Sequence, residues 1–440
     1  MKPKLHFTAP YYWLNDPNGL IYYKGKYHLF YQHFPYANFW GTMHWGHAVT
    51  DDFIHFDHLP FALYPSKDYD RNGCFSGSAI EMNGDLYLYY TAIRYAKENP
   101  EYVHIQYSDD DLIASQALMI SKDGYHFDNM NDKHKIIDVI KDSTIGDLRH
   151  TRDPKVWKTQ NGKIALVMGS KSPSETGYMG KALFYESEDG INFTYKNQYG
   201  DDTIGDMWEC PDVFKIDDQW FMIFSPEHIN EPPEPFNNAV YMAIEFDEDT
   251  LTIKDHKDYI YLDYGLDFYA PQTFVNKDGQ RMMLGWLRMR EPAQGEEWVG
   301  MMTMPRILTE KDGHIYQEVL PSIHSLFQVS SDTLSFDEPF LLQLDMKENS
   351  QINLGGLKLY IKDDCLYADR RDVSIEHELV CNVTHTAELN HQYHLDIYYD
   401  QHIFEIFIND GYYTFSQIVY DLDDSYEWTD VENVNMKMMK

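Results

Sequence analysis

A short unit built around a proline recurs along the first part of the chain. It reads Arg152-Asp153-Pro154-Lys155-Val156-Trp157, then Glu209-Cys210-Pro211-Asp212-Val213-Phe214, then Tyr269-Ala270-Pro271-Gln272-Thr273-Phe274. Each copy begins with a polar or aromatic residue and ends with an aromatic one. The prolines at positions 154, 211 and 271 are 57 and 60 residues apart. A strand unit repeated at this spacing limits the folds that are open to the chain.

Two earlier segments extend the series. Asn15-Asp16-Pro17 opens it, and Ser76-Gly77-Ser78 begins 60 residues after Asp16. Five starts at intervals of roughly 60–77 residues predict five repeats of a few strands each, which is typical of a β-propeller. A sandwich with regular turns would reproduce only part of this period. In a propeller, Asp16, Asp153 and Glu209 would all open onto one end of the central channel.

Short alternating runs between turn signals favour an all-β chain throughout. Residues 20–23 and 27–31 flank Lys24-Gly25-Lys26 as a hairpin would. Proline is tolerated at the first residue of a strand, where no ladder N–H is needed, and we expect the repeat prolines there. Further strand patterns after residue 323 predict a second, sandwich-like unit. We therefore predict a five-bladed β-propeller over 1–304, a linker over 305–322 and a β-sandwich over 323–440.

Charge and composition exclude several classes of partner. The chain carries 71 acidic and 36 basic residues, a formal net charge of −35, without a basic stripe, so nucleic acid and anionic membranes are poor partners. No apolar stretch has the length of a membrane span, and the first residues lack a signal-peptide pattern, so we expect a cytoplasmic protein. Four cysteines are too few for a disulfide framework, and no His/Cys cluster has metal-ligand spacing.

Three acidic residues stand out by their context. Asp16 lies in the segment Trp13-Leu14-Asn15-Asp16-Pro17-Asn18-Gly19, Asp153 follows Arg152, and Glu209 precedes Cys210-Pro211. Asn, Asp, Pro and Gly favour turns, so the first segment alone is most simply a turn. Turn preference does not explain why the other two acidic residues recur in the register of the repeats. The pattern therefore predicts a site whose chemistry uses carboxylates.

These motifs resemble glycoside hydrolase family 32, which includes invertases, sucrose-6-phosphate hydrolases and fructan hydrolases. Besides the units above, the resemblance is carried by Phe30-Tyr31-Gln32, Trp45-Gly46-His47, Phe75-Ser76-Gly77-Ser78-Ala79, Asp267-Phe268-Tyr269-Ala270-Pro271-Gln272, Gly285-Trp286, Met304-Pro305-Arg306 and Glu405-Ile406-Phe407-Ile408-Asn409-Asp410-Gly411. It covers nearly the whole chain. It implies a propeller followed by a sandwich, and a retaining β-fructofuranosidase that acts on sucrose 6-phosphate or sucrose without a metal or organic cofactor.

The resemblance also assigns roles to residues. Asp16 would attack the anomeric carbon, Glu209 would act as acid and then base, and Asp153 would stabilise the transition state. A retaining enzyme holds its two working carboxyls about 5–5.5 Å apart. Asp16 must then be ionised while Glu209 carries a proton. Arg152 would keep Asp153 anionic or bridge two blades.

By the same resemblance, a set of polar and aromatic residues would bind the fructosyl ring, whose hydroxyls need fixed hydrogen-bonding partners and whose carbon faces suit aromatic rings. For Tyr269 a place in the core is nearly as good an interpretation, Cys210 would shape the site, and His47 would be structural. The expected sugar-binding residues are Asn15, Gln32, Trp40, Phe75, Ser76, Arg152, Tyr269 and Trp286.

The leaving group stays open at this point. A phosphate would need a positive rim, for which Lys67, Arg71 and Arg94 are candidates, but the acidic stretch 96–111 weakens that interpretation. The alternatives are an exo-hydrolase of fructo-oligosaccharides, a related propeller glycosidase acting on arabinose polymers, and a fructan-binding module. A binding module would be expected to lack Asp16 or Glu209. Homo-oligomerisation and transfer to a sugar acceptor also stay open.

Overall fold

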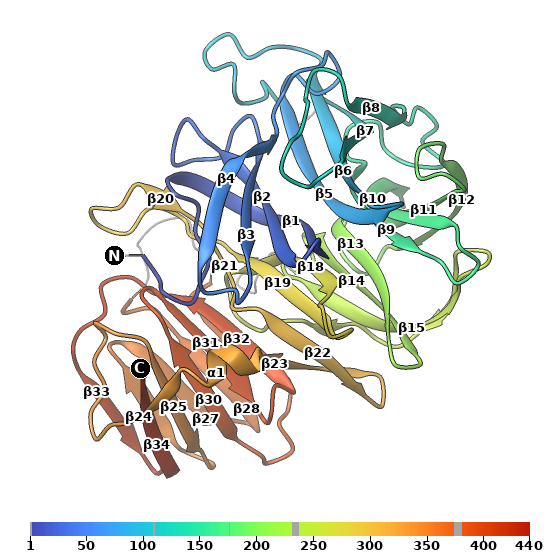
Figure 1. Cartoon of the computed structure of the whole chain (residues 1–440). Helices are drawn as coiled ribbons and strands as arrows, with labels where there is room; N and C mark the ends of the chain where they lie inside the picture. The colour runs from blue at the N-terminus through green and yellow to red at the C-terminus, as the bar shows by residue number, and fades with distance from the viewer. Residues whose placement is uncertain (1, 109–110, 176, 231–236, 374–380) are drawn as a thin grey trace.

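The computed structural model describes residues 2–108, 111–175, 177–230, 237–373 and 381–440. In these ranges the regular structure is almost entirely β-strand, with one short helix, α1 (Pro321–His324). The strands form seven sheets, of which five precede α1 and two follow it. None of the described helices is long and apolar enough to cross a membrane. The prediction of an all-β chain with a propeller followed by a sandwich is confirmed (Figure 1).

Each of the first three sheets contains an antiparallel ladder of four consecutive strands. The first contains β1 (Tyr12–Tyr23), β2 (Lys26–Phe34), β3 (His44–Thr50) and β4 (Phe56–Leu63). The second contains β5 (Gly73–Met82), β6 (Asp85–Tyr95), β7 (Leu112–Ser121) and β8 (Lys133–Ile137). The third contains β9 (Arg152–Lys158), β10 (Ile164–Ser174), β11 (Gly177–Ser187) and β12 (Thr194–Asp201).

The next two sheets complete the propeller. The fourth contains β13 (Met207–Ile216), β14 (Gln219–Glu227), β15 (Val240–Asp247), β16 (Thr252–His256) and β17 (Ile260–Tyr261). The fifth contains β18 (Phe268–Val275), β19 (Arg281–Leu287), β21 (Met301–Met302), β22 (Arg306–Lys311) and β23 (His314–Val319). The circle closes because β20 (Trp298–Val299), which lies just before β21 in the chain, pairs in parallel with β1.

The first strand of each blade lies near the propeller centre, where β1, β5, β9, β13 and β18 converge in Figure 1. In every blade the pairing between the first and the second strand contains a register shift. Examples are the shifts between Glu209 and Asp212 in β13 and between Tyr269 and Gln272 in β18. The repeat prolines therefore lie at bulges inside the strands, and the expected place at a strand's first residue is wrong. Proline fits there because a bulge leaves a residue without a ladder hydrogen bond.

The expected linker over 305–322 is also wrong for most of its length. Residues 306–319 form β22 and β23, and β22 pairs with β19, so this hairpin is the outer part of the fifth blade. Its mixed composition comes from the turn between Lys311 and His314, where Asp312 and Gly313 both have positive φ. A charged turn that contains glycine has the same composition as a connection between domains. The sheet pairing moves the end of the propeller from residue 304 to the end of β23.

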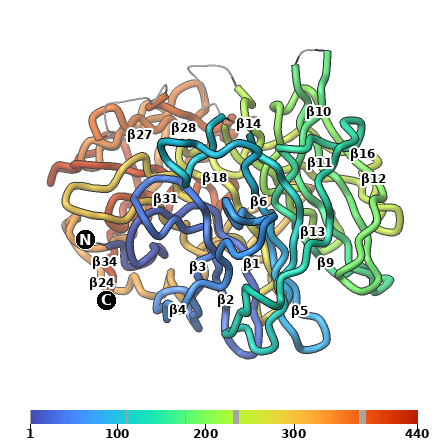
Figure 2. Tube along the Cα trace, turned by 90° about the horizontal axis from the view of Figure 1, so that it is seen from above, coloured from blue at the N-terminus to red at the C-terminus, as the bar shows by residue number. Residues whose placement is uncertain are grey.

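The C-terminal unit consists of two sheets that pack face to face around one apolar core. One sheet contains β24 (Phe327–Ser330), β25 (Phe340–Asp345), β30 (His394–Tyr399), β31 (Ile403–Ile408), β32 (Tyr413–Ile418) and β34 (Glu432–Met439). The other contains β26 (Gln351–Leu354), β27 (Leu357–Lys362), β28 (Cys365–Asp369), β29 (Val383–His385) and β33 (Tyr426–Thr429). Figure 2 shows the sandwich beside the propeller, with both chain ends on the sandwich side.

A buried polar network joins the two domains. Arg306 of the propeller forms ion pairs with Glu405 of the sandwich and with Asp263, and all three side chains are fully buried. His6, near the N-terminus, lies between Asp400 and Glu405 at 2.9 and 2.8 Å. Burial alone would lower the pKa of His6, but its hydrogen bonds to the two carboxylates raise it to about 9. The interface is therefore held by charged groups as well as by apolar contacts.

Candidate active site

The five bulges present equivalent pairs of residues at the centre of the propeller. In chain order the pairs are Asn15-Asp16, Phe75-Ser76, Arg152-Asp153, Glu209-Cys210 and Tyr269-Ala270. The backbone φ is positive at Asp153, Cys210 and Ala270, at 65°, 48° and 46°. This conformation is costly for residues other than glycine, and in folded proteins it collects at functional sites. Side chains from different blades meet as a result.

Asp16 is surrounded by hydrogen-bond donors. Ser76 Oγ donates to its Oδ2, and Asn15 Nδ2 donates to its Oδ1 at 3.1 Å. The thiol of Cys210 lies 3.6 Å from Oδ2. Asn15 is itself oriented by Trp13, whose indole N–H donates to Asn15 Oδ1 at 2.8 Å. These contacts fix the carboxylate and stabilise its ionised form.

Asp153 lies beside the same thiol. Its Oδ2 accepts a hydrogen bond from the Cys210 backbone N–H at 2.9 Å and lies 3.6 Å from Cys210 Sγ. Its own N–H donates to Thr91 Oγ1 at 2.9 Å. Burial and the negative charges of Asp16 and Glu209 raise the pKa of the Cys210 thiol well above its ordinary value. Cys210 therefore stays a neutral S–H donor between two carboxylates, which agrees with the expectation that it shapes the site.

Glu209 is held by two residues from neighbouring blades. Arg152 Nε donates to Glu209 Oε1 at 3.0 Å, and Tyr269 Oη donates to Oε2 at 2.7 Å. The preceding residue, Trp208, is fully buried, and its ring lies 4.2 Å from that of Phe224. Tyr269 is therefore a site residue, and Arg152 bridges two blades through Glu209.

Burial dominates the electrostatics of this carboxylate cluster. It raises the pKa of Asp16 to about 6, against hydrogen bonds from Ser76, Asn15 and Cys210 that lower it. Burial also raises the pKa of Asp153, and the charges of Glu209 and Asp16 add to this effect while Arg152 opposes it. With a pKa of about 6, Asp16 is ionised in most molecules at neutral pH.

A fourth carboxylate, Glu227, was not predicted from the sequence. Arg152 Nη2 lies 3.0 Å from Glu227 Oε1 and 2.9 Å from Glu209 Oε1, so the two glutamates share one guanidinium. Burial and the charge of Glu209 raise the pKa of Glu227 to about 7, against the opposing effect of Arg152. The hairpin of β13 and β14 pairs Met207 with Glu227. This pairing brings Glu227 to the site, and no sequence motif marks the residue.

The remaining expected sugar-binding residues border this cluster. Trp40 and Phe75 make an edge-to-face contact with ring centroids 5.6 Å apart, and both rings are partly exposed. Trp286 contacts Trp13 at 5.9 Å. Gln32 is buried and donates to the Cys74 carbonyl, one residue before Phe75, at 3.0 Å. These positions give the site aromatic faces beside its carboxylates.

Two further expectations concern residues outside the cluster. His47 is buried and hydrogen-bonds His28 at 3.0 Å, as a structural histidine would. Of the candidate phosphate-binding cations, Arg71 pairs with Glu98 at 3.2 Å and Arg94 with Asp68 at 3.5 Å. Lys67 donates to the Met130 carbonyl. Within the described ranges, no group of three His, Cys, Asp or Glu side chains could hold a metal ion.

Comparison with known protein families shows which family the chain belongs to. Residues 6–319 match the family described as glycosyl hydrolases family 32 N-terminal domain, and residues 361–436 match the family 32 C-terminal domain. The chain belongs to glycoside hydrolase family 32. As a family 32 member it is a glycoside hydrolase, and the resemblance found in the motifs is confirmed.

Curated relatives of this family 32 hydrolase cover most of its length. A sucrose-6-phosphate hydrolase of Escherichia coli is 37% identical over 79% of this chain and 70% of its own. One of Vibrio alginolyticus is 32% identical over 94% and 85%. Among solved structures, the Bombyx mori GH32 beta-fructofuranosidase BmSUC1 is 28% identical with a TM-score of 0.83, over 100% of this chain and 94% of that one.

The geometry of the family 32 site is suited to acid–base and nucleophilic chemistry. Asp16 is a partly buried carboxylate whose lone pairs are oriented by three donors, as a fixed nucleophile requires. Glu209 precedes Cys210 in the chain and pairs with Arg152, which also binds Glu227. A third carboxylate, Asp153, contacts Cys210 through its Oδ2.

Proposed function

We propose that this enzyme is a retaining β-fructofuranosidase that hydrolyses the fructosyl linkage of sucrose 6-phosphate or sucrose. One observation carries the proposal: Cys210 contacts both Asp16 and Asp153 through its thiol and is bonded in the chain to Glu209. Three carboxyl groups from three blades are thereby gathered at one point. The names of the relatives, sucrose-6-phosphate hydrolase and β-fructofuranosidase, support the same activity.

In the first step, Asp16 attacks the anomeric carbon of the fructosyl unit while Glu209 gives its proton to the glycosidic oxygen. The bond to the leaving group breaks, and a fructosyl ester forms on Asp16. In the second step, Glu209 takes a proton from water, the water oxygen attacks the same carbon, and the Asp16 carboxylate departs. Two displacements retain the configuration.

The charges around Arg152 explain how a proton can be present on the donor side. One guanidinium is shared by Glu209 and Glu227, so the three groups carry a net charge of −1 when both carboxylates are ionised. A proton taken up by the glutamate pair leaves Arg152 fully compensated by the other carboxylate. Asp153 would accept hydroxyl groups of the sugar and stabilise the oxocarbenium-like transition state.

The roles are tested by Asp16→Asn and Glu209→Gln. Each should lower kcat on sucrose by about a thousandfold or more, because neither amide can form the ester or donate the proton. Asp51→Asn is the matched control, since Asp51 lies on the same blade with a side chain 66% exposed. Turnover by Asp16→Asn close to that of the control would remove Asp16 from the mechanism.

The leaving group has a second candidate. The expected phosphate-binding arginines are paired with Asp68 and Glu98, which favours an uncharged sugar such as sucrose or a fructo-oligosaccharide. Comparing kcat/KM for sucrose, sucrose 6-phosphate and 1-kestose decides between them. A tenfold preference corresponds to about 1.4 kcal/mol at the transition state. The proposal includes a cytoplasmic enzyme, because four cysteines in 440 residues are too few for a disulfide framework, as suits a reducing compartment.

A further inference from the structure

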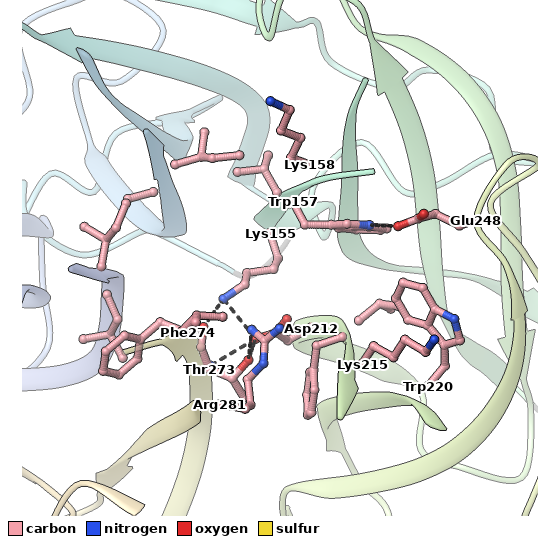
Figure 3. A pocket seen from close by; sticks show the side chains of 18 of the residues that line it. Lys155, Trp157, Lys158, Asp212, Lys215, Trp220, Glu248, Thr273, Phe274 and Arg281 are labelled. Atoms are coloured by element: carbon pink, nitrogen blue, oxygen red, sulfur yellow. Dashed lines mark hydrogen bonds and ion pairs between the residues drawn. The ribbon is translucent and has the colours of Figure 1, made fainter. Parts of the chain in front are cut away.

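A second cavity lies at the other end of the inner strands. Its volume is about 410 Å³, and Figure 3 shows it from close by. Along β9, Arg152 and Asp153 belong to the carboxylate cluster, whereas Lys155, Trp157 and Lys158 line this cavity. Arg152 and Lys158 are six residues apart, about 20 Å of extended strand, whereas Lys155 at the inner end of the cavity is only two residues from Asp153.

A constriction divides this cavity from the catalytic end. It is lined by the repeat prolines 17, 154, 211 and 271, and its volume is only about 10 Å³. Such a space holds about one water molecule. A ligand in the far cavity would therefore enter from the opposite face of the propeller, not through the catalytic pocket.

The far cavity is positively charged on a strongly acidic protein. Its basic lining residues are Lys155, Lys158, Lys215 and Arg281, and its acidic ones are Asp212 and Glu248. The lining therefore carries two more positive than negative charges, whereas the whole chain carries −35. This local excess of positive charge attracts small anions, which the acidic remainder of the surface repels.

In the described structure Asp212 forms an ion pair with only one of the two innermost cations, Lys155. Its Oδ2 lies 3.0 Å from Lys155 Nζ and also accepts hydrogen bonds from the Thr273 N–H and hydroxyl at 3.0 and 2.8 Å. Arg281 reaches only the Thr273 hydroxyl, at 3.3 Å, and its guanidinium lies 5.0 Å from the centre of the Phe214 ring. Figure 3 shows these groups together at the cavity wall.

Two buried polar atoms at this wall have no hydrogen-bond partner in the described structure: Arg281 Nε and Asp212 Oδ1. One is a donor on a cation and the other an acceptor on a carboxylate. Burial also lowers the pKa of both Lys155 and Arg281, and the charge of Asp212 opposes this effect. A ligand that offers both an anionic oxygen and a hydroxyl group would satisfy both atoms.

We propose that this cavity binds a small hydroxylated anion of the sugar-phosphate class. The anionic oxygens accept from Arg281, a hydroxyl donates to Asp212 Oδ1, and the carbon face of the ring lies against the partly exposed rings of Trp157 and Trp220. Trp157 is held in place because its N–H donates to Glu248 at 3.2 Å. The volume is within the range of small-molecule sites.

Calorimetric titration of the full chain with glucose 6-phosphate, inorganic phosphate and glucose tests the site. Glucose 6-phosphate should bind saturably, and more tightly than either phosphate or glucose. Arg281→Met should weaken this binding at least about tenfold. Lys277→Met is the matched control, because it removes an exposed cation from the same hairpin outside the cavity. Its dissociation constant should be unchanged.

Two further arms make the test decisive. Lys158→Glu changes an exposed rim residue that folding does not need, so weaker binding there supports the site even if Arg281→Met is unstable. In Asp16→Asn saturated with sucrose, the catalytic end is filled and the dissociation constant for glucose 6-phosphate should be unchanged. Failure of sucrose to bind that variant would count against the proposed function alone. Equal binding by wild type, Arg281→Met and Lys158→Glu would overturn the far site.

Discussion

Glu209 and Glu227 bind the same nitrogen of Arg152, with Nη2 2.9 Å from one carboxylate and 3.0 Å from the other. Glu227 therefore adds negative charge beside the proposed proton donor and takes part of its counter-charge. Burial and the charge of Glu209 raise the pKa of Glu227 itself to about 7. Glu227 is a positioning residue for the proton, and its effect should be visible in the pH profile.

Glu227→Gln tests this relationship. The amide removes a group whose pKa is about 7 and leaves Arg152 to pair with Glu209 alone. The basic limb of kcat/KM should lose the part that follows the ionisation of Glu227 near pH 7, while kcat at the optimum falls less than about tenfold. Glu248→Gln is the control, because Glu248 belongs to the same blade as Glu227 but lines the far cavity. An unchanged basic limb in Glu227→Gln would contradict the assignment.

Ser76→Ala should move the acid limb. The Ser76 hydroxyl donates to Asp16 and lowers its pKa, and in the proposed mechanism Asp16 attacks only when it is ionised. Without this hydrogen bond the pKa of Asp16 rises above about 6, so the acid limb of kcat/KM moves to higher pH. We expect a loss of about tenfold at pH 6 and a smaller loss at pH 8. An equal loss at both pH values would mean that Ser76 acts on binding alone.

Gly169→Ala tests how closely the blades must approach at the site. A Cβ at Gly169 would lie 1.8 Å from the carbonyl oxygen of Trp208, the residue before Glu209. Because backbone cannot yield as a side chain can, β13 must shift, and we expect kcat/KM to fall at least about a hundredfold with a lower Tm. Gly162→Ala is the control, since its position has φ of 88° and no neighbour within 4 Å. That variant should lose only about 1 kcal/mol of stability and keep its activity.

The spacing of the repeats made the site predictable. Once Asp16, Asp153 and Glu209 are placed in one register, a circular arrangement of blades brings them together without any knowledge of side-chain geometry. The partners of Glu209 were also within reach, since Arg152 and Tyr269 occupy the equivalent position of the neighbouring repeats. The equivalent positions of the five repeats therefore indicate which residues meet at the site.

Other features could not be deduced in this way. The bulges that hold the repeat prolines depend on strand pairing, which local turn chemistry does not reveal. Glu227 carries no motif of its own and is brought to Arg152 by a hairpin whose length the sequence leaves open. The hairpin 306–319 has a charged turn that a linker would share, and only its pairing with β19 distinguishes the two.

The stability of the whole chain should fall as the pH rises toward 9, because of His6. Its pKa is 6.5 when unfolded and about 9 when folded between Asp400 and Glu405. A raised folded-state pKa contributes stability that is complete below about pH 6.5 and is lost as the pH rises through about 9, a contribution on the order of 3 kcal/mol. His6→Gln should lower Tm at pH 6 by several degrees and by much less at pH 9.5.

His55→Gln removes a histidine beside Asp52 that is 86% exposed, and its Tm should follow that of the wild type at every pH. A His6→Gln deficit that is the same at pH 6 and pH 9.5 would mean that packing, rather than charge, holds this end of the interface.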